Sequence, residues 1–356
     1  MDFKTICITG GAGFVGSNVA IAFKRAYPAL DILAVDSLKR RGSELALGRL
    51  REHGVRFVHG DIRSPEDLAE LPAFDLLIDC SAEPSVQAGA AGSPAYVLHT
   101  NLTGTIHCLE AARMRGAAVL FLSTSRIYPM DKLNAVAFSE GATRFSWKVD
   151  GSMTGLSFEG VAEDYPLPGV RSFYGASKLA SELLLQEYVH AYGMKALINR
   201  CGVIAGPWQM GKVDQGVVTL WVARHVYGKP LSYNGYGGQG KQVRDVMHVD
   251  DVVDLLLKQC ASLKAWDGRV YNVGGGNTVS TSLRELTSVC EEVSGEKIAM
   301  ASVAETSPMD VRIYLTDARR VMRDFGWKPT RDMRAIVADV HRWIASDRAR
   351  LEPILG

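Results

Sequence analysis

The sequence lacks an excess of either charge and lacks long apolar runs. Its 40 basic and 39 acidic residues leave a net charge of +1 over 356 residues, which does not favour nucleic acid or another polyanion as a partner. No run approaches the ~18 to 20 consecutive apolar residues that span a membrane, so we expect no membrane partner. The opening MDFKTICITGG shows no basic segment followed by an apolar signal-peptide core.

Cysteine and histidine are few and irregularly spaced. No CxxC pair occurs, and the eight histidines show no HxxxH spacing, so we expect no metal site. The cysteines lie within apolar segments, as reduced core residues of a cytoplasmic protein do. They are Cys7, Cys80, Cys108, Cys201, Cys260 and Cys290.

Short apolar, β-rich runs alternate with helical patterns through the first half of the chain. The predicted strands are 4–10, 31–36, 55–61, 74–82, 118–125 and 195–204, with helices at 17–27, 43–54, 101–116 and 174–192. Continuous apolar strands between helices are typical of a parallel sheet that is covered on both faces. The sequence therefore predicts an α/β fold with a doubly wound parallel (Rossmann) sheet, whose ligands bind at the carboxyl ends of the strands. The 47% hydrophobic composition suffices for one large domain or two smaller ones.

The first strand-to-helix turn, TGGAGFVGSN, predicts a phosphate-binding loop. Gly10 permits the tight turn, Gly13 permits close approach of a pyrophosphate, and Gly16 lets the helix pack close to the strand. Phe14 and Val15 open the helix, whose N-terminal N–H groups attract phosphate. A glycine-rich turn without a ligand is the alternative, but the strand before it and the helix after it favour a dinucleotide site.

A carboxylate ends the second predicted strand about 20 residues later, at Asp36, where it accepts hydrogen bonds from the adenosine ribose. It also repels a 2′-phosphate and so favours NAD over NADP, although the basic residues 39–41 follow closely. Asp61 and Ile62 follow the third strand and are predicted to border the adenine, with an ordinary strand-end turn as the alternative.

Two tyrosines precede a lysine by four residues. Tyr128 and Lys132 are separated by Pro129, which makes one helical face improbable. Tyr174 and Lys178 open the helical segment YGASKLASELLLQEYVHAYG, so their side chains lie on one face. A solvated surface pair is the alternative, which a nucleotide-binding fold disfavours.

The second pair offers acid–base chemistry. Tyrosine is a poor base at pH 7, but a lysine ammonium and an oxidised nicotinamide, both cationic, favour the phenolate. Tyr174 is then able to take a hydroxyl proton while the same carbon loses hydride. A second hydroxyl that orients the substrate is expected at the end of the strand LFLSTS. Thr124 is the first choice, with Ser123 or Ser125 as alternatives. The competing interpretation is that these hydroxyls only cap the end of the strand.

Together these motifs resemble the extended short-chain dehydrogenase/reductases that act on nucleotide sugars, over nearly the whole chain. The matching positions are TGGAGFVG, Asp36, Thr124, Tyr174 and Lys178. A dehydratase of this group carries Asp-Glu after the hydroxyl residue, where this chain has Ser125-Arg126. A 4-epimerase typically shows Arg-Tyr-Phe-Asn after the next strand, where this chain has RCGV at 200–203.

Three segments are similar to the CDP-paratose (CDP-tyvelose) 2-epimerase branch. They are the long stretch 129–171, the pair MGKVDQGVV and GYGGQGKQVRDVMHVDD, and YNVGGGNTVSTSLREL. A connection as long as 129–171 within a compact domain is usually functional. The segment SAEPSVQAG departs from the branch, because Glu83 replaces Gln and Val86 replaces His.

The resemblance also implies where the substrate binds. A nucleoside diphosphate is best met by arginine, and the implied contacts are Arg244, Arg312 and Gln242, with surface ion pairs (Arg244 with Asp245, Arg312 with Asp310) as the alternative. Residues 1–202 and 241–275 are expected to form the NAD-binding domain. Residues 203–240 and 276–356 are expected to form a smaller C-terminal substrate-binding lobe. The resemblance further implies a homodimer.

The activity that the resemblance implies is epimerisation at C2 of a nucleotide sugar through a keto intermediate, with NAD regenerated in each cycle. The alternatives are a 4-epimerase or a net NAD-dependent oxidoreductase. A non-catalytic NAD-binding protein is disfavoured, because the Tyr174/Lys178 pair is intact.

Overall fold

The computed structural model describes residues 2–211 and 215–356, which divide into two compact units. Unit 1 contains Met1–Ile127, Ser172–Arg200 and Val253–Tyr271. Unit 2 contains Tyr128–Arg171, Cys201–Val252 and Asn272–Gly356. Part of the MGKVDQGVV segment, residues 212–214, lies outside the described residues. No helix in the described ranges is long and apolar enough to cross a membrane.

Unit 1 is built on a seven-stranded sheet in the order β3-β2-β1-β4-β5-β10-β14. The pairings from β3 through β5 are parallel. The strands are β1 (Thr5–Thr9), β2 (Asp31–Asp36), β3 (Arg56–His59), β4 (Leu76–Asp79), β5 (Ala118–Thr124), β10 (Ala196–Cys201) and β14 (Asp267–Val273). The order reverses between β1 and β4, which is where ligands bind in doubly wound sheets.

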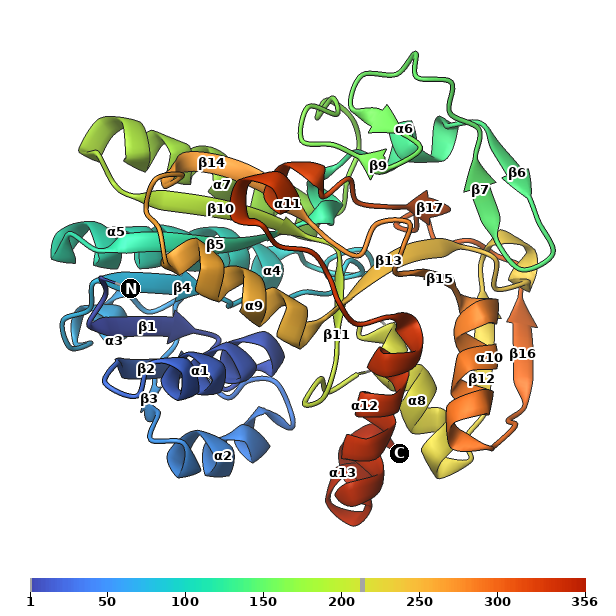
Figure 1. The fold of residues 1–356 in the computed structure, drawn as a ribbon, viewed down its shortest axis with the longest axis horizontal. Coiled ribbons are helices and arrows are strands. Elements are labelled where there is room, and N and C mark those ends of the chain that lie inside the picture. Colours follow the sequence, from blue (N-terminus) through green and yellow to red (C-terminus); the bar gives the residue numbers. More distant parts are fainter. Residues whose placement is uncertain (1, 212–214) are drawn as a thin grey trace. The chain divides into compact units, whose positions relative to one another are not determined.

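The helical elements that accompany this sheet connect its strands in sequence (Figure 1). They are α1 (Phe14–Ala26), η1 (Ser43–Leu45), α2 (Ala46–Glu52), α3 (Pro65–Ala69), α4 (Ala95–Leu98), the π-helical turn η2 (His99–Thr103), α5 (Gly104–Arg115), η3 (Ser125–Ile127), α7 (Phe173–Tyr192) and α9 (Val249–Cys260). Helix α1 packs on β1 and β2, whereas α5 and α7 pack on β5.

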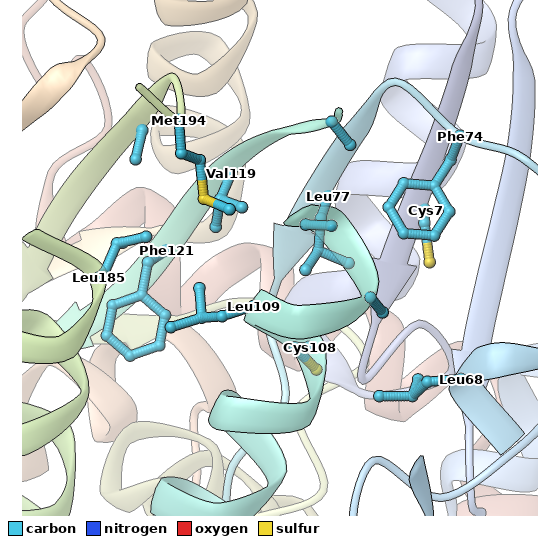
Figure 2. Close-up of a cluster of buried hydrophobic side chains, with 14 of the residues drawn as sticks. Cys7, Leu68, Phe74, Leu77, Cys108, Leu109, Val119, Phe121, Leu185 and Met194 are labelled. Carbon is cyan, nitrogen blue, oxygen red and sulfur yellow. The ribbon is translucent and has the colours of Figure 1, made fainter. Parts of the chain in front are cut away.

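Both faces of the sheet are buried. Cys7, Leu77 and Phe121 lie in one apolar cluster with side chains of α3, α5 and α7 (Figure 2). Ile6 and Ile8 flank Cys7 along β1, so they point to the opposite face, and they too are fully buried. The predicted doubly wound parallel sheet is therefore confirmed. All six cysteines are free thiols, and Cys80 is the one that is not fully buried.

Unit 2 combines small sheets with a helical group in which α8, α10 and α12 pack on one another. Its strands are β6 (Phe138–Glu140), β7 (Phe145–Trp147), β8 (Leu156–Ser157), β9 (Gly160–Val161), β11 (Val203–Ala205), β12 (Leu231–Asn234), β13 (Val243–His248), β15 (Ser280–Ser282), β16 (Met300–Val303) and β17 (Ile313–Tyr314). Its helices are α6 (Met130–Ala135), α8 (Val217–Tyr227), η4 (Tyr236–Gly238), α10 (Leu283–Ser294), α11 (Arg319–Phe325), α12 (Met333–Ser346) and α13 (Arg348–Leu355).

The stretch 128–171 belongs to unit 2, whereas the sequence analysis assigned it to the NAD-binding domain. Backbone hydrogen bonds explain its place. The Val161 N–H donates to the Leu315 carbonyl (2.8 Å), and the Asp317 N–H donates to the Val161 carbonyl (2.9 Å). Such pairing between distant segments leaves little trace in local sequence patterns.

Candidate active site

The glycine loop after β1 has the geometry that a dinucleotide pyrophosphate requires. Gly10 has φ +65°, and a Cβ there would lie 2.8 Å from the Cys80 carbonyl oxygen. A Cβ on Gly16 would lie 2.2 Å from the Gly10 carbonyl oxygen. Helix α1 follows with Gly13 at its N-cap and no side-chain cap, so the N–H groups of its first turn, at Phe14, Val15 and Gly16, have no intrahelical partner. They suit a phosphate.

Asp36 ends β2 beside this loop. One carboxylate oxygen accepts from the Ala12 N–H (3.1 Å) and the other from the Leu38 N–H (2.8 Å). Burial raises the pKa of this carboxyl, while the backbone N–H groups of Leu38, Ala12 and Gly13 act in the opposite direction. Each carboxylate oxygen retains capacity for a second donor, so ribose hydroxyls fit here. The loop and Asp36 together fit NAD.

Asp61 and Ile62 have partners of their own. The Asp61 carboxylate pairs with Arg63 (2.5 Å), and this hydrogen bond is the largest of the effects that lower the pKa of Asp61. Ile62 is buried in the apolar cluster, and its carbonyl lies 2.9 Å from Nδ1 of His107. Their predicted position beside the adenine stays a prediction.

Tyr174 and Lys178 lie on the first turns of α7, which begins after the Ser172 N-cap. The Lys178 ammonium donates to the carbonyls of Ser81 (3.3 Å) and Leu122 (3.1 Å), at the carboxyl ends of β4 and β5. It also lies 4.4 Å from the centroid of the Phe121 ring. Lys178 is 2% exposed, so its charge is held in a low-dielectric region one turn from Tyr174. In contrast, Tyr128 precedes α6 and donates to Asn272 Oδ1 (2.7 Å) in unit 2.

The hydroxyl residues at the end of β5 differ in their partners. Thr124, the last residue of β5, accepts from the Arg126 N–H (3.2 Å). Ser123 donates to the buried Glu182 carboxylate, which Arg200 binds with Nε and Nη2 (2.7 to 3.2 Å). Ser123 is thereby committed to a buried ion pair. The substrate-orienting role of Thr124, with Ser125 as its alternative, stays a prediction.

Asn101, which no sequence motif singled out, supports the segment that contains Glu83. It is fully buried in the π-helical turn η2, a feature frequent at functional sites. Its side-chain oxygen accepts from the Glu83 N–H (2.7 Å), and its amide donates to the Glu83 carbonyl (3.0 Å). Asn101 thus fixes the backbone of the segment that departs from the 2-epimerase pattern. A π-helical turn has no clear sequence signal.

The three predicted substrate contacts lie in unit 2. Arg244 forms an ion pair with Asp310 (2.6 Å). The alternative interpretation had paired it with Asp245 instead. The Arg312 guanidinium lies 4.0 Å from the centroid of the Phe138 ring and donates to a backbone carbonyl. Gln242 donates to the Asn234 carbonyl (2.9 Å).

Asp245, next to Arg244, is fully buried and accepts from the Gly276 N–H (3.2 Å). Burial raises the pKa of its carboxyl to about 6, against the lowering effect of the Thr316 hydroxyl and backbone N–H groups. Within the described ranges, no group of three or more His, Cys, Asp or Glu side chains is arranged to hold a metal ion.

The glycine loop, Asp36 and the Tyr174/Lys178 pair on one doubly wound sheet define a dinucleotide-dependent enzyme of the short-chain dehydrogenase/reductase class. The sequence profile of the NAD dependent epimerase/dehydratase family matches residues 6–274. The chain belongs to this family, which confirms the predicted family, the enzymatic class and NAD as the cofactor.

The similar proteins include both epimerases and dehydratases. CDP-paratose 2-epimerase of Salmonella typhi is 28% identical over 352 residues, which cover 96% of this chain and 99% of that protein. The dTDP-glucose 4,6-dehydratase of Streptomyces griseus is also 28% identical, over 98% of this chain and 97% of that protein. A solved dTDP-glucose 4,6-dehydratase of Streptomyces venezuelae (DesIV double mutant, with NAD and DAU bound) has a TM-score of 0.79 at 28% identity and covers 98% of this chain and 99% of its own. UDP-glucose 4-epimerase of Thermotoga maritima shares the fold, with a TM-score of 0.76 at 24% identity over 97% and 100% of the two chains.

Proposed function

We propose that this protein is an epimerase of a nucleoside-diphosphate sugar that inverts C2, with a CDP-paratose or CDP-tyvelose type of substrate. The sugar is oxidised to a keto-sugar, presents its other face and is reduced again. The alternatives are a UDP-sugar 4-epimerase and a net NAD-dependent oxidoreductase.

The observation that carries the proposal against a dehydratase is the identity of the residues after Thr124. Ser125 and Arg126 form the 3-10 turn η3 directly after β5, where a dehydratase places an acid and a base. A serine hydroxyl and an arginine are poor replacements at pH 7, because neither is a carboxyl group and arginine keeps its proton at this pH. Elimination of water therefore lacks its catalytic groups, whereas hydroxyl oxidation retains Thr124 and Tyr174.

The choice of C2 is supported by the similarity to the Salmonella typhi 2-epimerase over nearly the full length of both chains. The segments 235–251 and 271–286 match the 2-epimerase pattern. Glu83 and Val86 depart from it, in a segment that is proposed to face the sugar.

Tyr174 acts first as the base and then as the acid. Its phenolate takes the proton of the sugar hydroxyl while Thr124 holds that hydroxyl in place, and it returns the proton when the ketone is reduced. The Lys178 ammonium, fixed by the Ser81 and Leu122 carbonyls, stabilises the phenolate. The glycine loop and Asp36 would hold NAD, which would supply reversible hydride transfer at the sugar carbon.

Arg244, Arg312 and Gln242 are the proposed contacts of the nucleotide diphosphate. A guanidinium suits bidentate binding of phosphate oxygens, and of the two arginines Arg244 already pairs with the Asp310 carboxylate. Residues 203–240 and 276–356 are proposed to form the substrate-binding lobe.

A homodimer is proposed through α5 and α7. These helices carry exposed apolar side chains at Met114, Leu183 and Tyr192, and large exposed apolar residues favour association. Light scattering on the purified protein tests this, and Leu183→Glu is expected to give monomers. The six free thiols support a cytoplasmic location, which cell fractionation beside a cytoplasmic marker tests.

The function is tested by incubating the purified protein with CDP-paratose, CDP-tyvelose and UDP-glucose. Proton NMR identifies the product stereocentre, and absorbance at 340 nm detects NADH. A C2 epimer without standing NADH supports the proposal. A C4 epimer from UDP-glucose would establish the first alternative, and accumulating NADH the second.

A further inference from the structure

The stretch 128–171 contains a two-stranded hairpin whose role neither the family nor the proposed function assigns. Strands β6 and β7 pair antiparallel, with Phe138 opposite Trp147 and Glu140 opposite Phe145. A short turn joins them, closed by a hydrogen bond from the Gly141 N–H to the Arg144 carbonyl (2.9 Å). An isolated two-stranded hairpin is marginally stable in water, so its position depends on contacts with the rest of unit 2.

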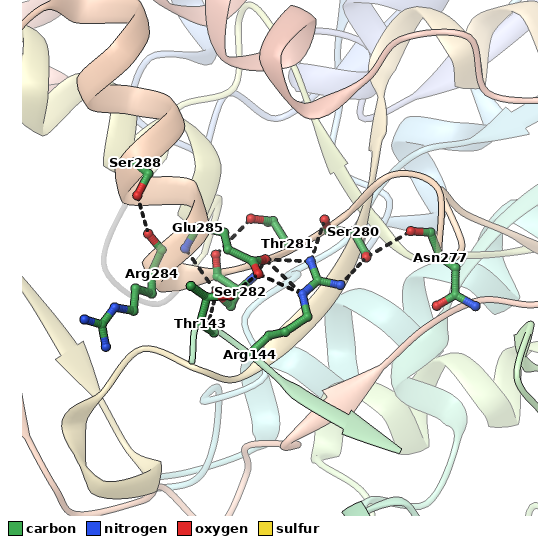
Figure 3. A network of polar contacts seen from close by, with 9 residues as sticks. All are labelled: Thr143, Arg144, Asn277, Ser280, Thr281, Ser282, Arg284, Glu285 and Ser288. Atoms are coloured by element: carbon green, nitrogen blue, oxygen red, sulfur yellow. Dashed lines mark hydrogen bonds and ion pairs between the residues drawn. The ribbon is translucent and has the colours of Figure 1, made fainter. Parts of the chain in front are cut away.

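The turn of this hairpin is bound to the first turn of α10 (Figure 3). Arg144 Nε and Nη2 donate to both carboxylate oxygens of Glu285 (2.6 to 3.1 Å), and Nη1 donates to Ser280 Oγ (3.1 Å). The Thr143 hydroxyl donates to the same carboxylate (2.7 Å). Glu285 also completes a capping box with Ser282, so a second set of hydrogen bonds holds its carboxylate.

Electrostatics favour this contact. Burial alone raises the pKa of the Glu285 carboxyl, but hydrogen bonds from Arg144, the Ser282 N–H and the Thr143 hydroxyl outweigh it and lower the pKa to about 2. The carboxylate is therefore charged at any physiological pH. Bidentate pairing of an arginine with a charged carboxylate fixes both distance and direction.

Lys241 contacts both strands of the hairpin. The Phe145 N–H donates to the Lys241 carbonyl (3.0 Å), and the Lys241 ammonium pairs with Glu140 (2.7 Å). The Phe145 side chain is buried in a small core with Val243 and Ile313.

The hairpin presents Phe138 to Arg312. The Phe138 ring packs edge-on against Phe145, with centroids 5.3 Å apart. The Arg312 guanidinium carbon lies 4.0 Å from the Phe138 centroid and 5.2 Å from the Tyr236 centroid. One guanidinium nitrogen donates to the Asn134 carbonyl (3.2 Å). Stacking on aromatic rings occupies the faces of a guanidinium and leaves its N–H edge for an acceptor.

Arg244 is held differently, because its guanidinium is paired with the Asp310 carboxylate (2.6 Å). An anion that binds Arg244 must compete with this carboxylate. Arg312 is stacked on neutral rings and keeps its charge available to a ligand. The two arginines are thus unequal as anion-binding groups.

We propose that the hairpin 138–147 is a positioning device for Arg312, in which Phe138 fixes the guanidinium so that its N–H edge binds the diphosphate of the substrate. This inference rests on the proposed nucleotide-sugar function. Phe138 is a positioning residue and touches no reacting atom, so its loss affects substrate binding and leaves the chemical step unchanged.

The test compares Phe138→Leu with Phe158→Leu, a matched variant at an exposed phenylalanine of the same stretch. Calorimetry on the NAD-loaded protein measures the binding of CDP, UDP and dTDP. Phe138→Leu is expected to weaken binding about fivefold, as loss of one partly exposed cation–π contact does. KM of the sugar substrate rises by a similar factor at unchanged kcat. Phe138→Tyr keeps the aromatic face and is expected to bind the nucleotides as the wild type does. The same is expected of Phe158→Leu.

A second comparison tests whether Phe138 acts through Arg312. In an Arg312→Ala background, Phe138→Leu is expected to cause no further loss, because the group that it positions is already gone. Arg144→Met is expected to weaken nucleotide binding as Phe138→Leu does. The matched control is Arg334→Met, which removes an exposed ion pair between Arg334 of α12 and Glu292 of α10. If Arg144→Met does not fold, the Phe138 variants still test the positioning role.

Two results overturn the inference and are distinguishable. If wild-type protein binds one of the nucleoside diphosphates and Phe138→Leu binds it equally well, or loses the same factor in the Arg312→Ala background, the positioning role is wrong. If wild-type protein binds none of the three, the proposed substrate class fails, and the inference with it.

Discussion

The buried ion pair between Glu182 of helix α7 and Arg200 of strand β10 gives the sharpest prediction about stability. Glu182 and Arg200 side chains are 2% and 7% exposed, and Arg200 Nη2 lies 2.7 Å from Glu182 Oε2. Ser123 donates to the same carboxylate. Glu182→Gln removes the negative charge with little change in shape and leaves the Arg200 charge buried without its counter-charge.

The free-energy cost of Glu182→Gln follows from the burial of this ion pair. Breaking a buried pair from one side costs about 3–5 kcal/mol, because the remaining charge stays desolvated. For a unit of this size, that corresponds to a fall in Tm of about 10 °C. A double variant, Glu182→Met with Arg200→Met, removes both charges and is expected to lose less than the single one. Because Ser123 precedes Thr124 and Glu182 follows Lys178 by one turn, kcat of Glu182→Gln is also expected to fall.

The assay is urea and thermal unfolding followed by circular dichroism. Asp31→Asn is the matched control, since it breaks an exposed pair with Arg56 (3.0 Å) at the edge of the same sheet. Exposed pairs contribute about 0–1 kcal/mol, so this variant is expected to unfold nearly as the wild type does. A loss below about 1 kcal/mol in Glu182→Gln would refute the reasoning, as would a double variant that is less stable than the single one.

Three further variants test the cofactor loop and the buried acid of unit 2. Gly16→Ala places a Cβ 2.2 Å from the Gly10 carbonyl oxygen and is expected to weaken NAD binding about fivefold or more in calorimetry, since overpacking costs about 1–3 kcal/mol. Asp36→Asn removes the charge that repels a 2′-phosphate, so the ratio of NADP to NAD affinity is expected to rise. The Asp245 carboxyl has a pKa of about 6 in the folded protein, so the stability that Asp245 contributes is expected to fall by about 2 kcal/mol as the pH rises from about 4 to 6. Asp245→Asn is expected to lack this contribution.

The sign of the Asp245 effect follows from its raised pKa. The folded protein binds the proton at a pH where the unfolded chain has already released it, so protonation stabilises the folded state. Equal pH slopes for wild type and Asp245→Asn between pH 4 and 6 would contradict the assignment. Unchanged NAD binding in Gly16→Ala, or an unchanged cofactor ratio in Asp36→Asn, would contradict the cofactor site.

Much of unit 1 could be predicted because its signals are local. The strand 31–36 has the predicted bounds, and the glycine loop and Tyr174/Lys178 lie on the elements that periodicity predicted. Each of these features is encoded within about ten consecutive residues. The predicted helix 43–54 is instead a 3-10 turn followed by the short α2, because helix ends are set by packing as well as by propensity.

The remaining features depend on contacts between distant residues. The Asn101–Glu83 hydrogen bonds arise from a π-helical turn, and the Ser123–Glu182 contact joins a strand to a helix. Likewise, Arg312 was predicted as a phosphate ligand, but its stacking on Phe138 spans two segments far apart in sequence. No periodicity or motif spacing carries such information.

One measurement tests the central claim most directly. CDP-paratose is incubated with the purified protein in deuterated water, and the C2 proton is followed by NMR. Transient oxidation at C2 is expected to give a mixture of the two C2 epimers, with the C2 hydrogen retained, no standing absorbance at 340 nm, and no reaction with Tyr174→Phe. Deuterium at C2, accumulating NADH, or full activity of Tyr174→Phe would contradict it.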